Sequence, residues 1–306
     1  MRALWRSVIL AAAILAVVVQ QAPAQDPHAA FAHLAVANQP PLLGTTGACE
    51  NGAPGGPCAQ TSTLVLLDPI TGKLITKIGP VGFTVNGLAW DRTSRKLYAS
   101  TSIGDTKFHG LITINPFTGA GTPVNPAATN FGIPLDPTAK FGGQSPIHSI
   151  AVDVFGHMVG WYEEFNGHTD TYVRINQQTG VATEFNDTGI DTSNNGVSFG
   201  EFNLLWNIDT TRLDALGTLI QNAYLINPFT GQPLLTVPLS PPTQAALGDF
   251  HPVSHLYYGL NFDTSFPPPR PTFIEVVNVL DGTIQELGQT VDDLHTLAFV
   301  PAKSLP

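Results

Sequence analysis

Short apolar segments alternate with turn-forming residues along most of this chain. One unit of this pattern occurs five times. In each copy an apolar run ends at an Asp or Asn, and a glycine follows four positions later. The copies read LVLLDPITG (64–72), LITINPFTG (111–119), VRINQQTG (173–180), AYLINPFTG (223–231) and EVVNVLDG (275–282). Their glycines are 47, 61, 51 and 51 residues apart, a period typical of the blades of a β-propeller.

The polar end of each unit predicts a tight turn between two strands. The Asx side chain can accept a hydrogen bond from the backbone two residues further on and so open the turn. Proline follows in three copies and presets φ, and the glycine then supplies the left-handed conformation that returns the chain as a hairpin. We therefore interpret these residues as structural in every copy. The Asx residues are Asp68, Asn115, Asn176, Asn227 and Asn278.

A second set of short apolar runs alternates with the turn units, and these runs suit strands that are buried on both faces. They read LAWD (88–91), IAVD (150–153), LLWN (204–207), LGDF (247–250) and LAFV (297–300). We expect them to be the innermost strands of five blades. Each of the first four is followed, after a short turn, by another expected strand; these are residues 97–101, 158–163, 213–218 and 256–262.

The fifth run has no such successor near the end of the chain, and the missing strand is expected at the other end. Residues His33–Asn38 resemble Lys96–Thr101 and precede the first turn unit. We therefore predict an all-β fold, a five-bladed β-propeller of four-stranded blades that is closed by pairing N- and C-terminal strands in one blade. Such closure removes open sheet edges, and neither a β-helix nor an open sandwich would predict a shared terminal blade.

The repeat resembles that of secreted bacterial β-propeller repeat proteins with DP-x-TG and LAWDP-type blades, on the evidence of DPITG (68–72) and LAWD (88–91). The resemblance covers essentially the whole chain after residue 24, and it implies the fold and export. It implies no particular function, because such proteins are largely of unknown function and include binding proteins as well as enzymes. The sequence has neither WD40-type dipeptides nor a double-glycine kelch motif.

The N-terminal residues 1–24 have the pattern of a signal peptide. Arg2 and Arg6 precede an apolar stretch, and Ala22-Pro23-Ala24 offers a small-x-small cleavage site. An uncleaved membrane anchor is the alternative, but the apolar stretch of about 12 residues is short for a bilayer. We expect a secreted or periplasmic protein without membrane insertion after signal removal, with a linker at 25–32, one propeller domain at 33–301 and a tail at 302–306.

Two cysteines, Cys49 and Cys58, lie in a Gly/Pro-rich stretch. In an oxidising compartment this pair predicts a disulfide bond that constrains a loop. A metal site would need further ligands close by, and nearby histidines are limited to His28 and His33.

Composition and charge narrow the range of ligands. Charged residues make up only 12% of the chain, whereas it holds 29 Gly and 26 Pro, a balance typical of a turn-rich β protein. The formal net charge of −10 becomes −12 without Arg2 and Arg6. A chain with this negative charge lacks the basic surface of a nucleic-acid-binding protein, and binding to anionic membranes is disfavoured. Small molecules, glycans or proteins remain as partners.

Loop lengths distinguish the two faces of the expected propeller. Turns that follow the innermost strands and the Asx turns are tight, whereas the long segments 39–62, 123–147, 186–200 and 263–272 share the other face. We expect binding residues on this long-loop face, because irregular segments on a rigid scaffold commonly carry them. Polar residues expected to ring the channel there are Asn86, His148, Glu201, Asn203, Asp249 and His295.

Two functions are consistent with this pattern. The first is an exported scaffold that binds a small ligand, glycan or protein through the long-loop face, with an apolar patch drawn from Phe131, Phe141, Phe165 and Phe266. The second is a glycosidase-like hydrolase or lyase, metal-assisted in one form, that uses His148, Glu201, Asp249 and His295 at the channel mouth. Alternatively, these polar residues only satisfy one another inside a wet channel. No nucleophile elbow, His-Glu-x-x-His or P-loop motif is present.

No cofactor is required by either function, but one loop partly matches a Ca²⁺ site. Asp191, Ser193 and Asn195 occupy alternate positions before Gly196, a spacing that lets side-chain oxygens surround a hard cation. Glu201 stands one position short of the usual bidentate Glu. The same residue types are also common in ordinary loops.

Overall fold

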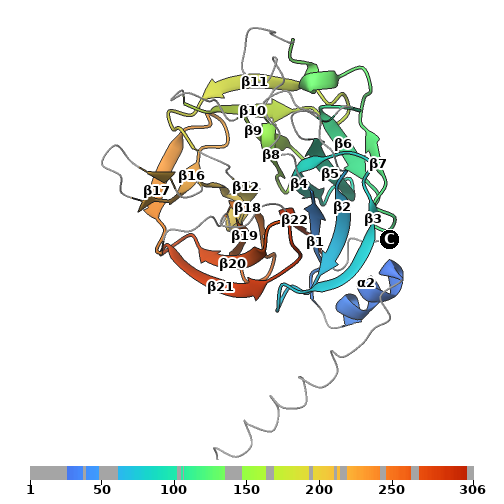
Figure 1. Cartoon of the computed structure of the whole chain (residues 1–306). Coiled ribbons are helices and arrows are strands. Elements are labelled where there is room, and N and C mark those ends of the chain that lie inside the picture. The colour runs from blue at the N-terminus through green and yellow to red at the C-terminus, as the bar shows by residue number, and fades with distance from the viewer. Residues whose placement is uncertain are drawn as a thin grey trace, which may run out of the picture.

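The chain folds into a ring of five antiparallel sheets around a central channel (Figure 1). This computed structural model describes residues 26–36, 39–47, 61–101, 105, 107–134, 147–162, 169–192, 196–209, 212–213, 219–241, 246–262 and 269–301. Within them, no helix is long and apolar enough to cross a membrane.

Each blade has four strands, which follow one another from the channel outward. Blade 1 is β22 (Leu294–Phe299), β1 (Leu42–Thr46), β2 (Thr63–Leu67) and β3 (Leu74–Pro80). Blade 2 is β4 (Val85–Asp91), β5 (Lys96–Thr101), β6 (Leu111–Ile114) and β7 (Gly121–Pro123). Blade 3 is β8 (Ile147–Val152), β9 (Met158–Tyr162), β10 (Thr171–Ile175) and β11 (Ala182–Asp187). Blade 4 is β12 (Gly196–Phe199), β13 (Leu205–Ile208), β16 (Asn222–Ile226) and β17 (Pro233–Pro238), and blade 5 is β18 (Ala246–Phe250), β19 (Tyr257–Phe262), β20 (Thr272–Asn278) and β21 (Thr283–Gln289).

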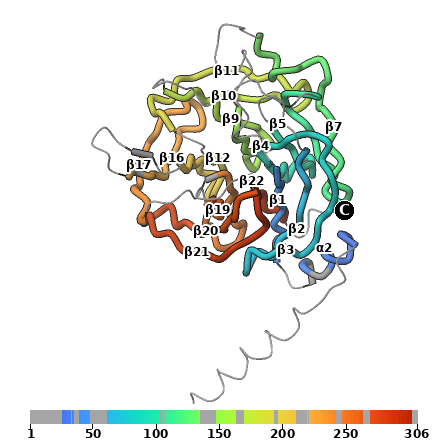
Figure 2. Tube along the Cα trace, in the orientation of Figure 1, coloured from blue at the N-terminus to red at the C-terminus, as the bar shows by residue number. Residues whose placement is uncertain are grey.

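The ring closes through blade 1, which combines both ends of the chain. β1 pairs antiparallel with β22 from Leu42–Phe299 to Thr46–Leu294, with a register shift between Thr45 and Thr46. Figure 2 follows the same closure along the trace, where the blue β1 lies beside the red β22. The predicted fold class, including the shared terminal blade, is therefore confirmed.

The closing strand itself lies later in the chain than predicted. Residues His33–Asn38 were expected to form it, but α2 (Pro27–Val36) includes the first four of them, residues 37 and 38 lie outside the described part, and β1 supplies the strand. Asp26 accepts a 2.9 Å hydrogen bond from the His28 N–H, and Pro27 stands at the first helical position. This capped, alanine-rich segment therefore favours a helix over a strand.

Blade 4 corrects a second expectation. Residues 204–207 were predicted to form an innermost strand, but 205–207 belong to the second strand, β13, which pairs between β12 and β16. The innermost strand is β12, and a turn containing the 3₁₀ segment Glu201–Asn203 joins the two. The strand expected at 213–218 is represented by β14 (Arg212–Leu213), which pairs with β15 (Leu219–Ile220) in an extra hairpin; residues 214–218 lie outside the described part.

All five Asx turns form as predicted. In each, the Asx Oδ1 accepts a backbone N–H two residues further on at 2.8–3.1 Å, and the closing glycine has φ between 70° and 79°. These turns share one face with the turns that follow the innermost strands, and we call it the short-turn face. The opposite face is the long-loop face.

Separate apolar clusters fill the space between neighbouring blades. One of them joins blades 1 and 2 through Leu64, Val85 and Trp90, and Phe31 of α2 extends it outward. Trp161 and Trp206 are buried in the clusters between blades 3 and 4 and between blades 4 and 5. Trp90, Trp161 and Trp206 are therefore core residues.

Candidate functional site

A cavity of about 420 Å³ opens at the channel end on the short-turn face, and we call it the channel mouth. It is formed by the turns that follow four innermost strands, β4, β8, β12 and β18. Side chains from all four turns line it, among them Arg92, Phe155, Glu201, Phe202, His251 and His255. Its volume lies within the range of small-molecule sites.

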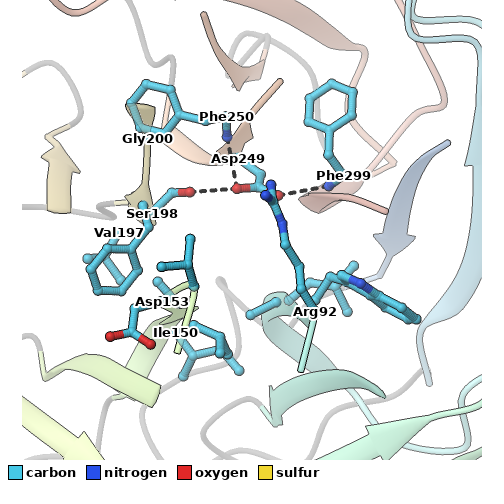
Figure 3. A pocket seen from close by; sticks show the side chains of 17 residues that line it. Arg92, Ile150, Asp153, Val197, Ser198, Gly200, Asp249, Phe250 and Phe299 are labelled. Atoms are coloured by element: carbon cyan, nitrogen blue, oxygen red, sulfur yellow. Dashed lines mark hydrogen bonds between the residues drawn. The ribbon is translucent and has the colours of Figure 1, made fainter. Parts of the chain in front are cut away.

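A smaller cavity of about 60 Å³ continues the channel mouth inward between the innermost strands (Figure 3). Arg92, Val154, Phe199, Gly200 and Phe250 line both spaces. With a volume of about 60 Å³, the inner cavity is large enough for one or two waters. It connects the channel mouth to a partly buried carboxyl group.

That carboxyl group belongs to Asp249. Its Oδ1 accepts hydrogen bonds from Ser198 Oγ at 2.5 Å and from the Phe250 N–H at 2.8 Å, and its Oδ2 accepts one from the Phe299 N–H at 2.8 Å. Burial raises the pKa of Asp249, although the three hydrogen bonds and the charge of Arg92 oppose the rise. Asp249 thus joins three innermost strands through hydrogen bonds to both carboxyl oxygens.

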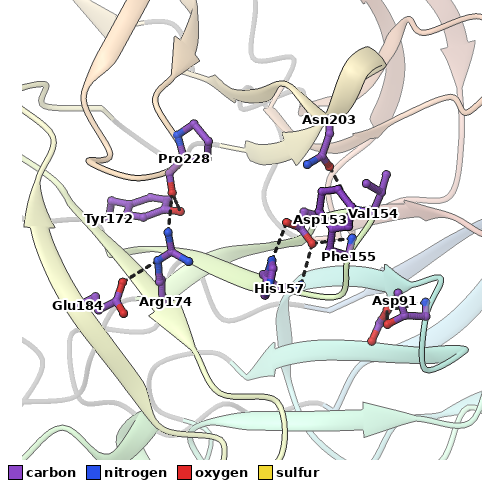
Figure 4. A network of polar contacts seen from close by, with 11 residues as sticks. Asp91, Asp153, Val154, Phe155, His157, Tyr172, Arg174, Glu184, Asn203 and Pro228 are labelled. Carbon is purple, nitrogen blue, oxygen red and sulfur yellow. Dashed lines mark hydrogen bonds and ion pairs between the residues drawn. The ribbon is translucent and has the colours of Figure 1, made fainter.

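Two aspartates hold the turns of blades 2 and 3. Asp153 Oδ1 accepts the N–H groups of Phe155 at 2.9 Å and His157 at 2.7 Å, and its Oδ2 lies 2.9 Å from His157 Nδ1 (Figure 4). Asp91 accepts the Thr93 N–H and the hydroxyls of Thr93 and Ser94. Burial alone would raise the pKa of Asp91, but these hydrogen bonds outweigh it and lower the pKa.

A histidine takes the same position in blade 5. His251 follows β18, and its Nδ1 accepts the backbone N–H groups of Val253 at 3.3 Å and Ser254 at 3.0 Å. Burial, with a smaller contribution from the charge of His255, lowers the pKa of His251. The neutral imidazole is the form that can accept these hydrogen bonds at Nδ1.

The turn of blade 4 has an unusual backbone. Phe202 has φ 56° and ψ 22°, Asn203 has φ 60°, and the Leu204 N–H donates to the Glu201 carbonyl oxygen at 3.1 Å. Two positive φ values are typical of a type I′ hairpin turn, which favours Asn and Gly at these positions. A phenylalanine there costs on the order of 1–2 kcal/mol.

Phe202 gains no packing in return for this conformation. Its side chain is 84% exposed. Phe131 has nearly the same backbone, with φ 53° and ψ 28°, but its side chain is fully buried in the cluster between blades 2 and 3. Burial compensates the backbone cost at Phe131, and no described contact of the core compensates it at Phe202. Retained backbone strain of this kind is common at functional sites.

A second exposed aromatic stands on the neighbouring turn. Phe155, in the β8–β9 turn, is 72% exposed and also lines the channel mouth. The Val154 N–H donates to Asn203 Oδ1 at 3.0 Å, so the two turns that carry Phe155 and Phe202 are tied together (Figure 4). The two phenyl rings are thus presented from adjacent, hydrogen-bonded turns.

Charged groups complete the channel mouth. Glu201 Oε1 lies 3.8 Å from His255 Nε2, and both side chains are nearly half exposed. Such an exposed pair contributes little stability. Arg92 enters from the β4–β5 turn, and Figure 3 shows its guanidinium directed toward Asp249. The channel mouth therefore combines apolar rings with both signs of charge.

The sequence-predicted polar residues do not converge on one site. Asn86, His148 and His295 each occupy the second position of their innermost strand. Asp249 is level with Phe299, four residues beyond His295 on β22, which corresponds to about 13 Å along a strand. His295 is buried with its ring 5.8 Å from that of Phe262. His148 and His295 are thus near the long-loop face, and Asp249 is near the short-turn face.

Glu201 and Asn203 lie on the opposite face from the one predicted. They were expected just before an innermost strand, but they form the turn after β12, because β13 is the second strand of its blade. Both reach the channel mouth. The cavity that the described residues form there is therefore on the short-turn face, whereas the sequence favoured the long-loop face.

Other predicted sites fall partly or wholly outside the described residues. Cys49 and Cys58 do so, as do Ser193 and Asn195 of the calcium hypothesis; Asp191 is described and lies beside the buried Thr192. Among the described residues, no three His, Cys, Asp or Glu side chains gather closely enough to hold a metal ion. Phe131, expected in an exposed patch, is buried, and the other three phenylalanines of that patch are not described.

Arg92, Phe155 and Phe202 are among the channel-mouth residues that were not predicted from the sequence. All three follow an innermost strand within a tight turn, at positions that turns usually fill with small or polar residues. DVFGH (153–157) and GEFN (200–203) each place a phenylalanine among such residues. This contrast is the sequence feature that could have identified the rim of the channel mouth.

The sequence matches no protein-family model and no curated protein. Several solved structures are similar in fold at low identity. An α-L-arabinofuranosidase from Clostridium thermocellum has a TM-score of 0.48 at 12% identity, covering 84% of this chain and 95% of its own. A putative 6-phosphogluconolactonase from Bacteroides uniformis has a TM-score of 0.40 at 14% identity, covering 82% of each chain. Hydrazine synthase from Kuenenia stuttgartiensis has a TM-score of 0.37 at 11% identity, covering 80% of this chain and 66% of its own. These similarities concern the fold alone.

Proposed function

We propose that this propeller is a binding scaffold and that the channel mouth receives a small molecule or one unit of a glycan. The exposed Phe202 on a left-handed backbone carries this proposal. An apolar ring in water and a strained turn both oppose stability, so their retention at the rim of a cavity is best explained by a ligand that covers the ring.

The rim suits a ligand with a flat apolar face. Phe155 and Phe202 stand on turns held together through Asn203, so little ordering of the turn backbone is required on binding. Preorganisation of this kind raises affinity by reducing the entropy lost. Sugars and aryl groups both present faces that pack on phenyl rings.

Ligand-observed NMR with a library of neutral and charged fragments and short oligosaccharides tests the proposal. Phe202→Ser and Phe155→Ser should remove the signals of bound fragments. Phe229→Ser is the matched control, because Phe229 is 77% exposed in a turn on the same face but does not line the channel mouth. Binding that survives both rim variants, or a library without any hit that Phe202→Ser removes, would overturn the proposal.

A hydrolase or lyase is the second candidate, and the Glu201–His255 pair favours it. These groups lie 3.8 Å apart on two turns of the channel mouth and could act as acid and base on one ligand. Hydrolysis of p-nitrophenyl glycosides that Glu201→Gln abolishes would support this function. Turnover that Glu201→Gln leaves unchanged would refute this assignment.

The proposal includes export, supported by the signal-like N-terminal segment and the cysteine pair. Expression of the full chain in a bacterial host, fractionation and intact mass measurement test both points. We expect a mature chain that starts near Gln25 and gains about two mass units on reduction of Cys49–Cys58. An unprocessed chain in the cytoplasm would contradict the proposed export.

A further inference from the structure

Within the described part of the chain, Arg92 places a guanidinium without a hydrogen-bond partner in a cavity lining. It lines both the channel mouth and the inner cavity, and among the described residues it makes no hydrogen bond or ion pair. Arg174 shows the usual arrangement on the same fold, since it pairs with Glu184 at 2.7 Å and donates to the Pro228 carbonyl oxygen at 3.1 Å (Figure 4). Arg92 therefore keeps its donors available at the base of the channel mouth.

The nearby carboxyl group does not serve as its partner. Asp249 faces Arg92 in Figure 3, but no hydrogen bond or ion pair joins them, and the carboxyl oxygens instead accept hydrogen bonds from Ser198, Phe250 and Phe299. Burial also favours the protonated form of Asp249, which makes it a weaker counter-ion. A ligand anion in the cavity would meet an unpaired guanidinium.

We infer that the ligand of the channel mouth carries a carboxylate bound by Arg92 and a flat apolar face packed against Phe155 and Phe202; this rests on the function proposed above. A guanidinium presents parallel N–H donors that match the two oxygens of a carboxylate. Arg92 lies in the turn after β4, and the two rings lie in the turns of blades 3 and 4, so one compact ligand can reach all three.

Glu201 orients such a ligand. It stands on the same turn as Phe202 and is held near His255, so a carboxylate placed at the rim would meet a like charge. The same carboxylate placed inward meets Arg92 instead. Asp153 and Asp249 line the inner cavity, so the acid group is expected beside Arg92 and no deeper. Repulsion from Glu201 at the rim and attraction to Arg92 at the base then select one orientation of the ligand.

Two sources share this chemistry: an aryl carboxylate, and a uronosyl unit of an acidic glycan. Isothermal titration at pH 7 and low salt separates them, with benzoate against benzamide as one pair and trigalacturonate against its methyl ester as the other. In one of the pairs we expect the acid to bind at least about tenfold more tightly than its neutral partner, as charge-assisted hydrogen bonds imply. The pair that shows this preference identifies the source.

Variants assign the preference to Arg92. Arg92→Gln should remove the acid preference by lowering the acid affinity about tenfold or more, with a much smaller change in the neutral affinity. Arg95→Gln, in the same turn but outside the cavity lining, is the matched control and should keep the preference. Arg92→Lys should retain part of the acid preference, because the positive charge remains but the parallel N–H donors of the guanidinium are lost.

The outcomes separate this inference from the function on which it rests. Equal binding of acid and neutral ligands, both removed by Phe202→Ser, would overturn the carboxylate inference and keep the binding scaffold. An acid preference that Arg92→Gln leaves intact would overturn the role of Arg92. Failure of all four ligands to bind would overturn the inferred ligand class, and the fragment screen would then decide the proposed function independently.

Discussion

The Oδ2 atom of Asp249, on β18, accepts a 2.8 Å hydrogen bond from the backbone N–H of Phe299, on β22. Because β22 belongs to the closing blade, this contact fastens the last innermost strand of the ring to its neighbour. Ser198 of β12 binds the other oxygen at 2.5 Å. One side chain thus connects blades 4, 5 and 1.

Removing this carboxyl group should weaken the whole ring. Asp249→Ala leaves the buried Phe299 N–H and the Ser198 hydroxyl without their acceptor, and each unsatisfied group costs about 1–3 kcal/mol. We expect a loss of about 2–4 kcal/mol in the free energy of unfolding, measured by urea denaturation. Asp281→Ala is the control, since the carboxyl of Asp281 binds only within its own exposed turn; an equal loss in both variants would contradict the connecting role.

The raised pKa of Asp249 predicts a pH dependence with a definite sign. The folded state holds the proton of this carboxyl more tightly than the unfolded state, whose pKa is near 3.8. The contribution of Asp249 to stability should therefore fall as pH rises from about 3.8 through the folded pKa, and then stay level. Asp249→Asn lacks this titration. As pH rises through that window, the free energy of unfolding of the wild type should therefore fall relative to that of the variant. A difference that is constant from pH 4 to 8 would refute the assignment.

The lowered pKa of His251 acts in the opposite direction. Its unfolded value is near 6.5, so the unfolded state binds the proton first as pH falls. The contribution of neutral His251 to the free energy of unfolding should be complete above about pH 6.5. It should decline as pH falls from there through the folded pKa. A ¹³C- or ¹⁵N-NMR titration of this imidazole should give a midpoint below 6.5, and a midpoint above that value would contradict the burial argument.

The two left-handed phenylalanines predict opposite responses to glycine. Phe202→Gly should stabilise the protein by about 1 kcal/mol, because glycine relieves the positive φ and an 84% exposed side chain loses little packing. Phe131→Gly should destabilise it by about 3–5 kcal/mol, because the buried ring leaves a cavity. Melting curves of both variants check this, and ligand binding should be lost only in Phe202→Gly. Equal destabilisation in both would mean that Phe202 packs on something that stabilises the fold.

Weakening the contact between helix α2 and the ring should release the helix without unfolding the ring. Phe31 packs edge-to-face on Phe117 with centroids 5.5 Å apart, and His28 stacks on the same ring at 4.3 Å. Phe31→Ala should cost α2 about 3 kcal/mol of docking energy. Hydrogen exchange should then accelerate in α2 while the amides of β4 remain protected. Equal acceleration in both would show that α2 belongs to the cooperative core.

The fold was predictable because turn-forming residues recur at the same positions in each repeat. Asx, proline and glycine have narrow conformational roles, so five copies fixed the number of blades and the positions of the hairpins. The identity of strands within blade 4 was not predictable in the same way. Innermost and second strands are both buried on two faces, so LLWN (204–207) and LAWD (88–91) look alike although they differ in position.

The site was predicted less well, for a related reason. Placing Glu201 and Asn203 on a face required the correct order of strands in blade 4, and the extra β14–β15 hairpin concealed that order. The conformation of Phe202 depends on a turn whose residues do not favour it, so local propensity argues against the structure that forms. Asp249 was identified as a channel residue, but its hydrogen bonds to Ser198 and Phe299 depend on contacts between three blades.

The antiparallel pairing of β1 with β22 also determines how the ring responds to mechanical force. The segment that enters β1 at Leu42 and the segment that leaves β22 at Phe299 lie at the same end of the pair. A pull on these two segments would load the Leu42–Phe299 hydrogen bonds first and then each following pair in turn, as in opening a zipper. Strands pulled from opposite ends would share the load across all pairs at once. The closure that removes the edges of the ring therefore resists thermal opening better than it resists tension along the chain.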